Sequence, residues 1–323
     1  MKANPSDLLG VILAAGKGTR MLPFSESYPK PMLPIGGHPL LVHQILAMKD
    51  IGIRDIIIVI GHLGYEIVRQ LGDGSEHGVE LRYVEQEETL GIAHALSKLE
   101  RLVDRPFFLF LGDIFFETDD LGLMLQKMGD GGRDDTAAVL AVKREPDREA
   151  IMRNFVVHVA DDESVTRVVE KPRRPRTDLK GCGLYFFDVA IFDAIRRTPR
   201  TAMRDEYEIT DSIQIFIDDG WRVEVAEIVK EDLNLSYPTD LLALNLHFLR
   251  MTGQDRIIGS DVVLPEGTEV KESIIMEGAR ILHPIRIERA LIFPGTVIDR
   301  KGPVEKVILT PGHEVHCASL FQT

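Results

Sequence analysis

A glycine-rich segment near the start of the chain carries residue types that can bind phosphate groups. It reads LAAGKGTRMLP over residues 13–23, after an apolar run that begins at Gly10. Closely spaced glycines allow backbone N–H groups to point at an anion, and Arg20 and, further along, Lys30 add two charges that could clamp a triphosphate. The segment is therefore a candidate nucleotide-phosphate loop, although the same turn taken alone is also compatible with a structural role.

Two familiar types of phosphate loop do not match this segment. A Walker A loop needs the pattern GxxxxGK[ST], whereas Lys17 precedes the second glycine here, which excludes that class. A dinucleotide-binding turn needs GxGxxG, and Met21 occupies the place of the third glycine that allows close helix packing. The pattern therefore favours a phosphate cradle of a third kind.

The composition narrows the function classes. The 323 residues include 38 Lys and Arg against 51 Asp and Glu, a formal net charge of −13, so no nucleic-acid or membrane partner is predicted. No apolar run approaches the roughly 20 residues of a membrane span, and the first one lacks the basic start of a signal peptide. Cys182 and Cys317 lie far apart and suggest no disulfide or zinc motif, so a reducing, cytoplasmic location is expected.

The loop needs a scaffold, and the hydrophobic pattern predicts one. Runs rich in Val, Ile, Leu and Phe lie at residues 10–15, 55–61, 81–86, 107–113 and 136–142, with amphipathic segments between them. Between the first two runs, Leu41, Ile45 and Met48 have helical spacing, and the predicted helix ends at Gly52. The alternation predicts an α/β, Rossmann-like fold, a mostly parallel sheet flanked by helices that binds ligands at the carboxyl ends of its strands.

Two further regions follow. From residue 154 the strands become denser, with helices predicted over 207–220 and about 238–251. After Gly253, apolar residues recur every six positions, at Ile258, Leu264, Val270, Met276 and Leu282. A six-residue period is typical of a left-handed parallel β-helix, and an irregular β-sandwich is the alternative. The predicted domains are 1–252, with two halves that meet near residue 140, and a short β-helix-like domain at 253–323.

The loop belongs to a longer pattern, GxGTRMxPxxxxxPKPMLP, and further motifs follow it in order: VEQEETLGIAHAL, FLGD, VVEKP, GLYFFD, YEITD and YPTDLL. In this series the chain resembles the sugar-1-phosphate nucleotidylyltransferase family over roughly residues 9–250. The resemblance implies the nucleotide-diphospho-sugar transferase fold, with a nucleotide half of about 1–140 and a sugar-phosphate half of about 141–252. It also implies transfer of a nucleotidyl group from a nucleoside triphosphate to a sugar 1-phosphate, with release of pyrophosphate and with Mg²⁺ as cofactor.

The resemblance assigns nucleotide-binding roles at the matching positions. Arg20 would hold the β- and γ-phosphates, and Lys30 would lie at the phosphates undergoing transfer. Gln86 would pair with the edge of the base, and Gly91 would let the chain pass close to its ring. The remaining residues expected to line the nucleotide site are Leu13, Ala14, Ala15, Gly16, Gly18 and Thr19.

The same resemblance assigns the metal and the sugar phosphate. Asp113 would be the carboxylate ligand of Mg²⁺, and it completes the catalytic set with Arg20 and Lys30. Glu170 would accept hydrogen bonds from sugar hydroxyls and Lys171 would bind the sugar phosphate. Phe155 and Gly183 would border that subsite.

Several positions depart from the family pattern, among them Ser236, Tyr237 and Ile114, and two further departures bear directly on the candidate site. In DLNLSYPTDLL, Asn234 stands where the family has a second metal-binding Asp, so an oxygen donor is kept and one charge is lost; a slip of the alignment could instead bring in Asp232. Phe155 stands where a glycine commonly precedes the paired valines. These departures leave a second hypothesis, a catalytically weakened relative that binds nucleotide or NDP-sugar as a sensor or regulatory subunit.

The substrates and the assembly are predicted only as classes. Gln86 and the small residues of LAAG favour UTP or dTTP, and the expected acceptor is glucose 1-phosphate or a related hexose. The family is usually oligomeric, so a homo-oligomer is expected, and the short C-terminal coils would serve packing or oligomerisation.

Overall fold

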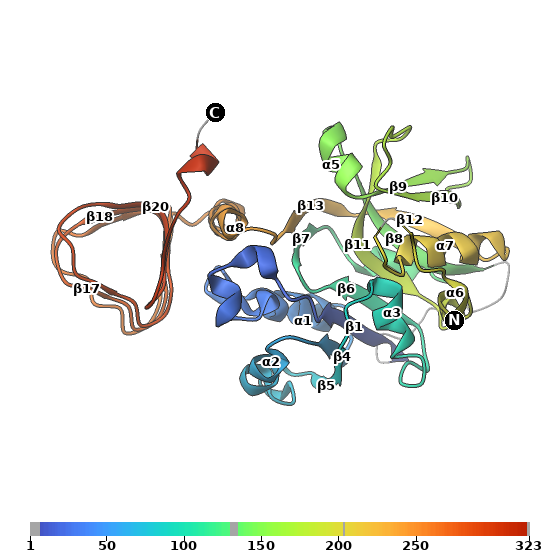
Figure 1. Ribbon diagram of the computed structural model, residues 1–323, viewed down its shortest axis with the longest axis horizontal. Helices are drawn as coiled ribbons and strands as arrows, with labels where there is room; N and C mark the ends of the chain where they lie inside the picture. The colour runs from blue at the N-terminus through green and yellow to red at the C-terminus, as the bar shows by residue number, and fades with distance from the viewer. Residues whose placement is uncertain (1–6, 130–134, 203, 322–323) are drawn as a thin grey trace. The chain divides into compact units, whose positions relative to one another are not determined.

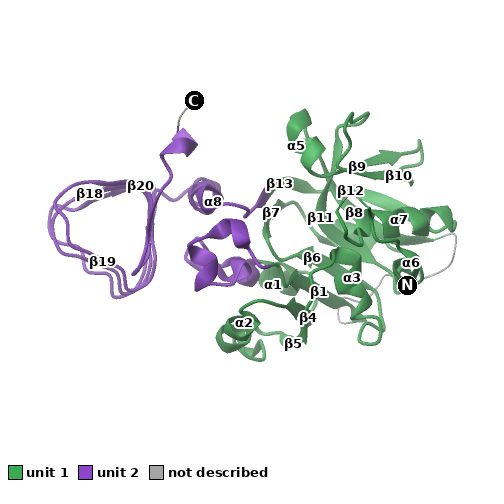
Figure 2. Cartoon of the chain, in the orientation of Figure 1, with its two compact units in different colours: residues 1–16, 44–232 green, residues 17–43, 233–323 purple. Residues whose placement is uncertain are grey.

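The computed structural model describes residues 7–129, 135–202 and 204–321. The chain forms two compact units: residues 1–16 and 44–232 make the first, and residues 17–43 and 233–323 make the second (Figure 2). The sequence predicts domains of 1–252 and 253–323, which differs from this division. The division differs because a segment of the N-terminal region, residues 17–43, packs with the C-terminal part of the chain, which a reading along the sequence does not reveal.

The first unit is built on one large sheet (Figure 1). Its centre consists of four neighbouring parallel strands in the order β6, β1, β4, β5. Their bounds are β1 (Leu9–Ala14), β4 (Asp55–Ile60), β5 (Glu80–Glu85) and β6 (Phe107–Leu111). The predicted parallel sheet is confirmed in this half, and the four carboxyl ends lie at one edge of the sheet.

The second half of the sheet is mainly antiparallel. β11 (Leu179–Phe187) pairs antiparallel with β6, with β8 (Thr136–Arg144) and with β9 (Phe155–Val159). β10 (Val165–Glu170) extends the sheet beyond β9, and β12 (Arg222–Glu227) runs parallel to β8. A separate pair is formed by β7 (Ile114–Thr118) and β13 (Val229–Asn234). The sheet as a whole is therefore mixed around a parallel core.

Helices cover both faces of this sheet. α3 (Ile92–Ser97), α6 (Ile191–Arg197) and α7 (Ile209–Asp218) share one buried cluster with alternate residues of the strands. On the other face, α1 (Leu40–Asp50) comes so close to β1 that a side chain at Gly10 would meet the Met48 sulfur at 2.5 Å. The remaining helices of the first unit are α2 (Gly64–Leu71), α4 (Gly122–Lys127) and α5 (Arg148–Arg153). Within the described residues, no helix has the length and apolar character needed to cross a membrane.

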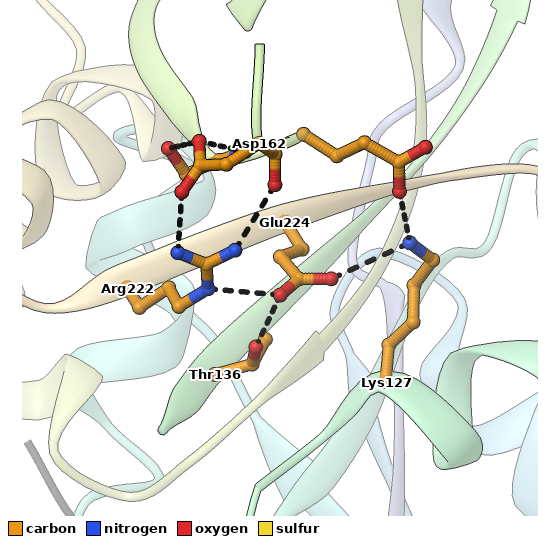
Figure 3. Close-up of polar contacts among 7 residues, drawn as sticks. Lys127, Thr136, Asp162, Arg222 and Glu224 are labelled. Carbon is orange, nitrogen blue, oxygen red and sulfur yellow. Dashed lines mark hydrogen bonds and ion pairs between the residues drawn. The ribbon is translucent and has the colours of Figure 1, made fainter. Parts of the chain in front are cut away.

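A polar network fastens α4, β8, β12 and the turn between β9 and β10 to one another (Figure 3). Glu224 accepts hydrogen bonds from Thr136, Arg222 and Lys127, and Arg222 also donates to Asp162 at 2.8 Å. Burial alone would raise the pKa of Glu224, but these hydrogen bonds outweigh it, so the pKa lies below the ordinary value. The network therefore favours the ionised carboxylate.

In the second unit, the segment 17–43 is attached to helix α8 (Pro238–Met251), whose bounds match the prediction. Asn245 of α8 accepts a hydrogen bond from the backbone N–H of Gly36 at 2.9 Å and donates to the carbonyl of Pro34 at 2.8 Å. These contacts hold the short hairpin of β2 (Pro34–Ile35) and β3 (His38–Pro39). Phe24 also stacks on Phe293 of the C-terminal coils, with ring centroids 5.8 Å apart.

The C-terminal strands wind as parallel β-helix-like coils, as predicted. Ile257, Ile274, Leu291 and Ile308 stack in register, each 17 residues after the last. A final antiparallel strand follows the last coil. The strands are β14 (Arg256–Ile258), β15 (Glu269–Lys271), β16 (Ser273–Ile275), β17 (Arg280–Ile281), β18 (Arg286–Ile292), β19 (Val297–Ile298), β20 (Val304–Leu309) and β21 (Glu314–His316).

The repeat of these coils is not a strict six. Interior residues follow one another in steps of five, six and six, at Val270, Ile275, Ile281, Ile287, Ile292, Ile298, Val304 and Leu309. The six-residue pattern therefore loses register: Ile258 and Leu282, which it places inside, are 42% and 46% exposed. Two corners of the coil are marked by residues with positive φ that recur every 17 positions. One corner has Asp261, Gly278 and Gly295, and the other has Glu272, Arg289 and Lys306.

Candidate active site

The first cluster of predicted site residues lies at the carboxyl ends of the parallel strands. The Gly112 N–H donates to the carbonyl of Leu13 at 2.9 Å, and a Cβ at Gly112 would come within 2.6 Å of that oxygen. The turn that carries Asp113 is therefore held against the end of β1. Gly61, which follows β4, packs equally closely against Ala15. A Cβ at Gly61 would lie 2.6 Å from the carbonyl oxygen of Ala15. Residues 13–16 and Asp113 are thus brought together by backbone packing that requires glycine.

Gln86 lies at the same edge, after β5. Its N–H donates to the carbonyl of Ile60, and its side chain is 6% exposed. The Gln86 amide nitrogen donates to the carbonyl of Glu88 at 2.8 Å and lies 3.3 Å from Nδ1 of His94. Burial lowers the pKa of His94, which favours the neutral ring that can accept at Nδ1. The amide nitrogen of Gln86 is therefore occupied by contacts within the protein, and its carbonyl oxygen takes no part in them.

Gly91 is required by a close approach of two loops. Its φ is +103°, and a Cβ there would lie 2.4 Å from the carbonyl oxygen of Tyr207. Tyr207 donates its N–H to the carbonyl of Leu90, accepts from the N–H of Ala93, and stacks its ring on His94 at 6.0 Å. Tyr207 was not singled out from the sequence, although it begins the YEITD motif.

The VVEKP motif forms a charged cluster on the second half of the sheet. Glu170 at the end of β10 accepts a hydrogen bond from Arg204 at 3.0 Å, and the Lys171 ammonium lies 3.7 Å from the same carboxylate. Arg204 also pairs with Glu208 at 3.0 Å. Burial first and the charge of Glu170 second raise the pKa of Glu208, and they raise that of Asp211 in the same way. Arg204 and Glu208 were missed because nothing in their spacing links them to Glu170.

Phe155 and Gly183 belong to the packing beneath this cluster. The Phe155 ring is 6% exposed, stacks on Tyr185 at 6.1 Å, and covers Gly181. Gly183 has φ +73° in β11, where the register with β8 shifts, and a Cβ there would meet Leu111 at 2.8 Å. The benzyl group at position 155 is thus matched by the absence of a side chain at Gly181.

In the second unit, the segment predicted to bind phosphate has a left-handed turn at Gly18. Its φ is +60°, and a Cβ there would lie 3.3 Å from Cβ of Lys30, which is itself 9% exposed. The guanidinium carbon of Arg20 lies 5.3 Å from the centre of the Tyr237 ring, a cation–π contact. Thr19 is exposed in the short helical turn Thr19–Met21. Gly18 is therefore needed both for its backbone conformation and for the approach of Lys30.

Asp232 and Asn234, which end β13, have different surroundings. The Asp232 side chain is 2% exposed and pairs with Lys180 at 2.7 Å, while Lys143 lies 3.8 Å away. Asn234 is exposed. Asp232 is therefore committed to a buried ion pair, which argues against the alternative alignment that brings it into the site. No group of three or more His, Cys, Asp and Glu side chains suited to a metal ion occurs in the described part of the chain.

Comparisons with known proteins agree with this fold and these motifs. Residues 9–232 match the family described as nucleotidyl transferase. The UTP–glucose-1-phosphate uridylyltransferase AglF of Haloferax volcanii is 35% identical over 230 residues, which cover 71% of this chain and 92% of the relative. A glucose-1-phosphate thymidylyltransferase of Streptomyces antibioticus is 32% identical over 299 residues, which cover 89% of this chain and 82% of the relative.

A solved structure shows the same likeness. The Bacillus anthracis protein described as a glucose-1-phosphate thymidylyltransferase, in complex with sucrose, superimposes with a TM-score of 0.65 and 27% identity, over 75% of this chain and 95% of that one. The fold and the sequence match together define a nucleotidyl transferase. The chain belongs, within that class, to the sugar-1-phosphate nucleotidylyltransferase family.

Proposed function

We propose that the protein transfers a nucleotidyl group from a nucleoside triphosphate to a sugar 1-phosphate. An oxygen of the sugar phosphate attacks the α-phosphorus, the new P–O bond forms as the bond to the β-phosphate oxygen breaks, and pyrophosphate leaves. The observation that carries the proposal is the family match over residues 9–232, in which Gly16, Gln86 and Asp113 follow the carboxyl ends of the parallel strands β1, β5 and β6. Such a reaction needs positioning and charge neutralisation rather than a covalent intermediate.

The roles proposed for the nucleotide-binding residues are compatible with their surroundings. Arg20 would hold the β- and γ-phosphates, and Lys30 would neutralise charge at the transferring phosphates, so loss of Lys30 should lower rate more than binding. The Gln86 carbonyl oxygen can accept a hydrogen bond from the N3–H of uracil or thymine, whereas cytosine carries no hydrogen there. This supports UTP or dTTP as the favoured donor.

On the acceptor side, the Glu170 carboxylate would take sugar hydroxyls and Lys171 the phosphate. Arg204 donates to Glu170 at 3.0 Å and so fixes the orientation of this carboxylate. The curated relatives of Haloferax volcanii and Streptomyces antibioticus are named for glucose 1-phosphate. Glucose 1-phosphate or a related hexose is therefore the acceptor that we propose.

Mg²⁺ is the cofactor that we propose, since Asp113 and Asn234 offer carboxylate and amide oxygens, the donors that this hard cation prefers. When bound, Mg²⁺ supplies charge neutralisation at the triphosphate. The commitment of Asp232 to Lys180 leaves Asn234 as the oxygen donor of β13. This donor set has one charge fewer than the family pattern and should bind the cation more weakly.

Coupled measurement of pyrophosphate release across nucleoside triphosphates and sugar 1-phosphates tests the proposal. We expect turnover with UTP or dTTP and glucose 1-phosphate, and its loss in Asp113→Asn and Lys30→Met. Arg173→Gln is a suitable control because Arg173 is exposed and lies outside these motifs. No pyrophosphate from any pair in the presence of Mg²⁺ would refute the proposal.

The lost charge at Asn234 supports a second candidate, a weakened relative that senses nucleotide or NDP-sugar. It predicts heat of nucleotide binding without turnover, and no recovery of activity in Asn234→Asp. Turnover by the unaltered protein would exclude it.

We also propose a homo-oligomer in a reducing, cytoplasmic setting. The short coils offer packing surface, and Cys182 and Cys317 are both free and buried. Light scattering that shows a monomer, or fractionation that finds the protein outside the cytoplasm, would contradict these two points.

A further inference from the structure

A basic cavity lies on the outer face of the hairpin formed by β9 and β10, which run side by side (Figure 1). Its volume is about 530 Å³. Three guanidinium groups and an imidazole line it, from Arg167, Arg174, Arg176 and His158. Four such groups around one hollow are unexpected on a chain of net charge −13.

The strand register explains how the cavity is built. His158 of β9 faces Arg167 of β10, and Val156 faces Val169, so these side chains share one face of the hairpin. The alternate residues Val157 and Val168 lie in the core cluster on the other face. The loop after β10 then brings Arg174 and Arg176 to the same hollow.

The guanidinium groups of these arginines are not used in ion pairs. Within the described residues, no side chain of Arg167, Arg174 or Arg176 forms an ion pair or a side-chain hydrogen bond, and all three residues are exposed. Arg82 and Arg222, by contrast, each pair with a carboxylate at 2.8 to 3.0 Å. Like charges gathered without partners repel one another, and an anion that bridges them would remove that cost.

The floor of the cavity adds a second feature. Val156, Val169 and Pro172 give it an apolar base. A volume of about 530 Å³ falls in the roughly 300–1,000 Å³ range of ligand pockets. Guanidinium groups match phosphate oxygens, and an apolar base accommodates a ring. We infer that this cavity binds a nucleoside diphosphate, either free or as the diphosphate part of a nucleotide sugar.

This site is distinct from the Glu170–Lys171 pair. Glu170 pairs with Phe155, and the next pair along the hairpin is Val169 with Val156. Because successive side chains of a strand point to opposite faces, Glu170 points away from the face that carries the cavity. Phe155 belongs to the core cluster. The inference therefore concerns a second binding site and goes beyond the proposed transfer reaction.

Calorimetric titration of the full-length protein with UDP tests the inference. We expect the variant Arg167→Gln/Arg174→Gln/Arg176→Gln to bind one UDP fewer per chain than the unaltered protein, or to bind it at least about tenfold more weakly. Arg173→Gln is the matched control, because Arg173 is exposed in the same loop but does not line the cavity. It should bind UDP as the unaltered protein does.

Unchanged UDP binding in the triple variant, or an equal loss in Arg173→Gln, overturns the inference. The comparison is independent of turnover, so a protein without transferase activity would still show the difference of one UDP. The same titration with UDP-glucose distinguishes the occupants: binding weakened in the triple variant for UDP alone supports the free nucleotide, and binding weakened for both ligands supports a nucleotide sugar as well. The nucleotide assignment is refuted if inorganic pyrophosphate binds as tightly as UDP. It is also refuted if the triple variant loses binding of a single-stranded RNA while its binding of UDP is unchanged.

Discussion

The contact between Phe155 and Gly181 yields a testable prediction about packing in the antiparallel half of the sheet. A Cβ at Gly181 would lie 1.9 Å from Cζ of Phe155 and 2.1 Å from Cε2, whereas ordinary contacts begin at 3.4 Å. In Gly181→Ala the ring must therefore retreat by about 1.5 Å. It has little room, since it is 6% exposed and stacks on Tyr185.

Overpacking of this kind costs about 1–3 kcal/mol, and we expect Gly181→Ala to lie near about 3 kcal/mol. Phe155→Ala should cost about 3–5 kcal/mol, because it empties a buried site. In the double variant the added methyl meets no ring, so the total cost should stay close to that of Phe155→Ala alone. The two substitutions are thus predicted to couple by about 2–3 kcal/mol.

Urea unfolding followed by tryptophan fluorescence measures these free energies. Trp221 is the single tryptophan, and it stacks on Phe216 with ring centroids 5.2 Å apart, so it reports on the same unit. Gly16→Ala is the control in the same unit, because a Cβ there meets no atom within 4 Å. Costs that add within about 0.5 kcal/mol, or a Gly181→Ala variant as stable as Gly16→Ala, would refute this reasoning.

Three further predictions concern charged groups. Asp232→Ala should destabilise the first unit by about 3–5 kcal/mol in the same urea assay, because it leaves the buried ammonium of Lys180 without its partner at 2.7 Å; a cost below about 1 kcal/mol would contradict this. Glu224 has a pKa below its ordinary value of 4.5. Its contribution to the free energy of unfolding is therefore fully present above pH 4.5 and is lost as the pH falls through the lower pKa of the folded state. Thermal melts should therefore show the advantage of the unaltered protein over Glu224→Gln shrinking on acidification, and a constant difference would count against the network. Tyr237→Leu should raise KM for the nucleoside triphosphate about two- to fivefold with little change in kcat, because it removes the ring beneath Arg20, while Tyr237→Phe should behave as the unaltered protein does; equal effects of both variants would contradict a cation–π role.

Local patterns sufficed for most of the secondary structure. Pro238 at a helix start and the apolar spacing after it predict a helix over 238–251, and α8 spans Pro238–Met251. The parallel strands were predicted from their apolar runs, since burial on both faces selects Val, Ile, Leu and Phe. The antiparallel insertion of β11 beside β6 was not predicted, because strand direction depends on how distant segments meet.

Candidate site residues could be proposed from the sequence where a motif contains them, but not where only a tertiary contact links them to a motif. Glu170 and Lys171 were predicted from VVEKP, but Arg204, which binds Glu170, lies 34 residues further along without a pattern. Tyr237 could be noted only as a departure from the family tract. Its contact with Arg20 joins residues more than two hundred positions apart.

The stacked corners of the C-terminal coils fix how this part of the chain can change in length. Since Glu272, Arg289 and Lys306 repeat the same left-handed corner, one full circuit always consumes 17 residues. Duplication of residues 273–289 would add a complete rung and keep every interior side chain inside. Insertion of a different number of residues within a rung would turn the interior residues that follow toward solvent. Evolution or design can therefore lengthen this unit in whole rungs, each stabilised mainly by its two neighbours.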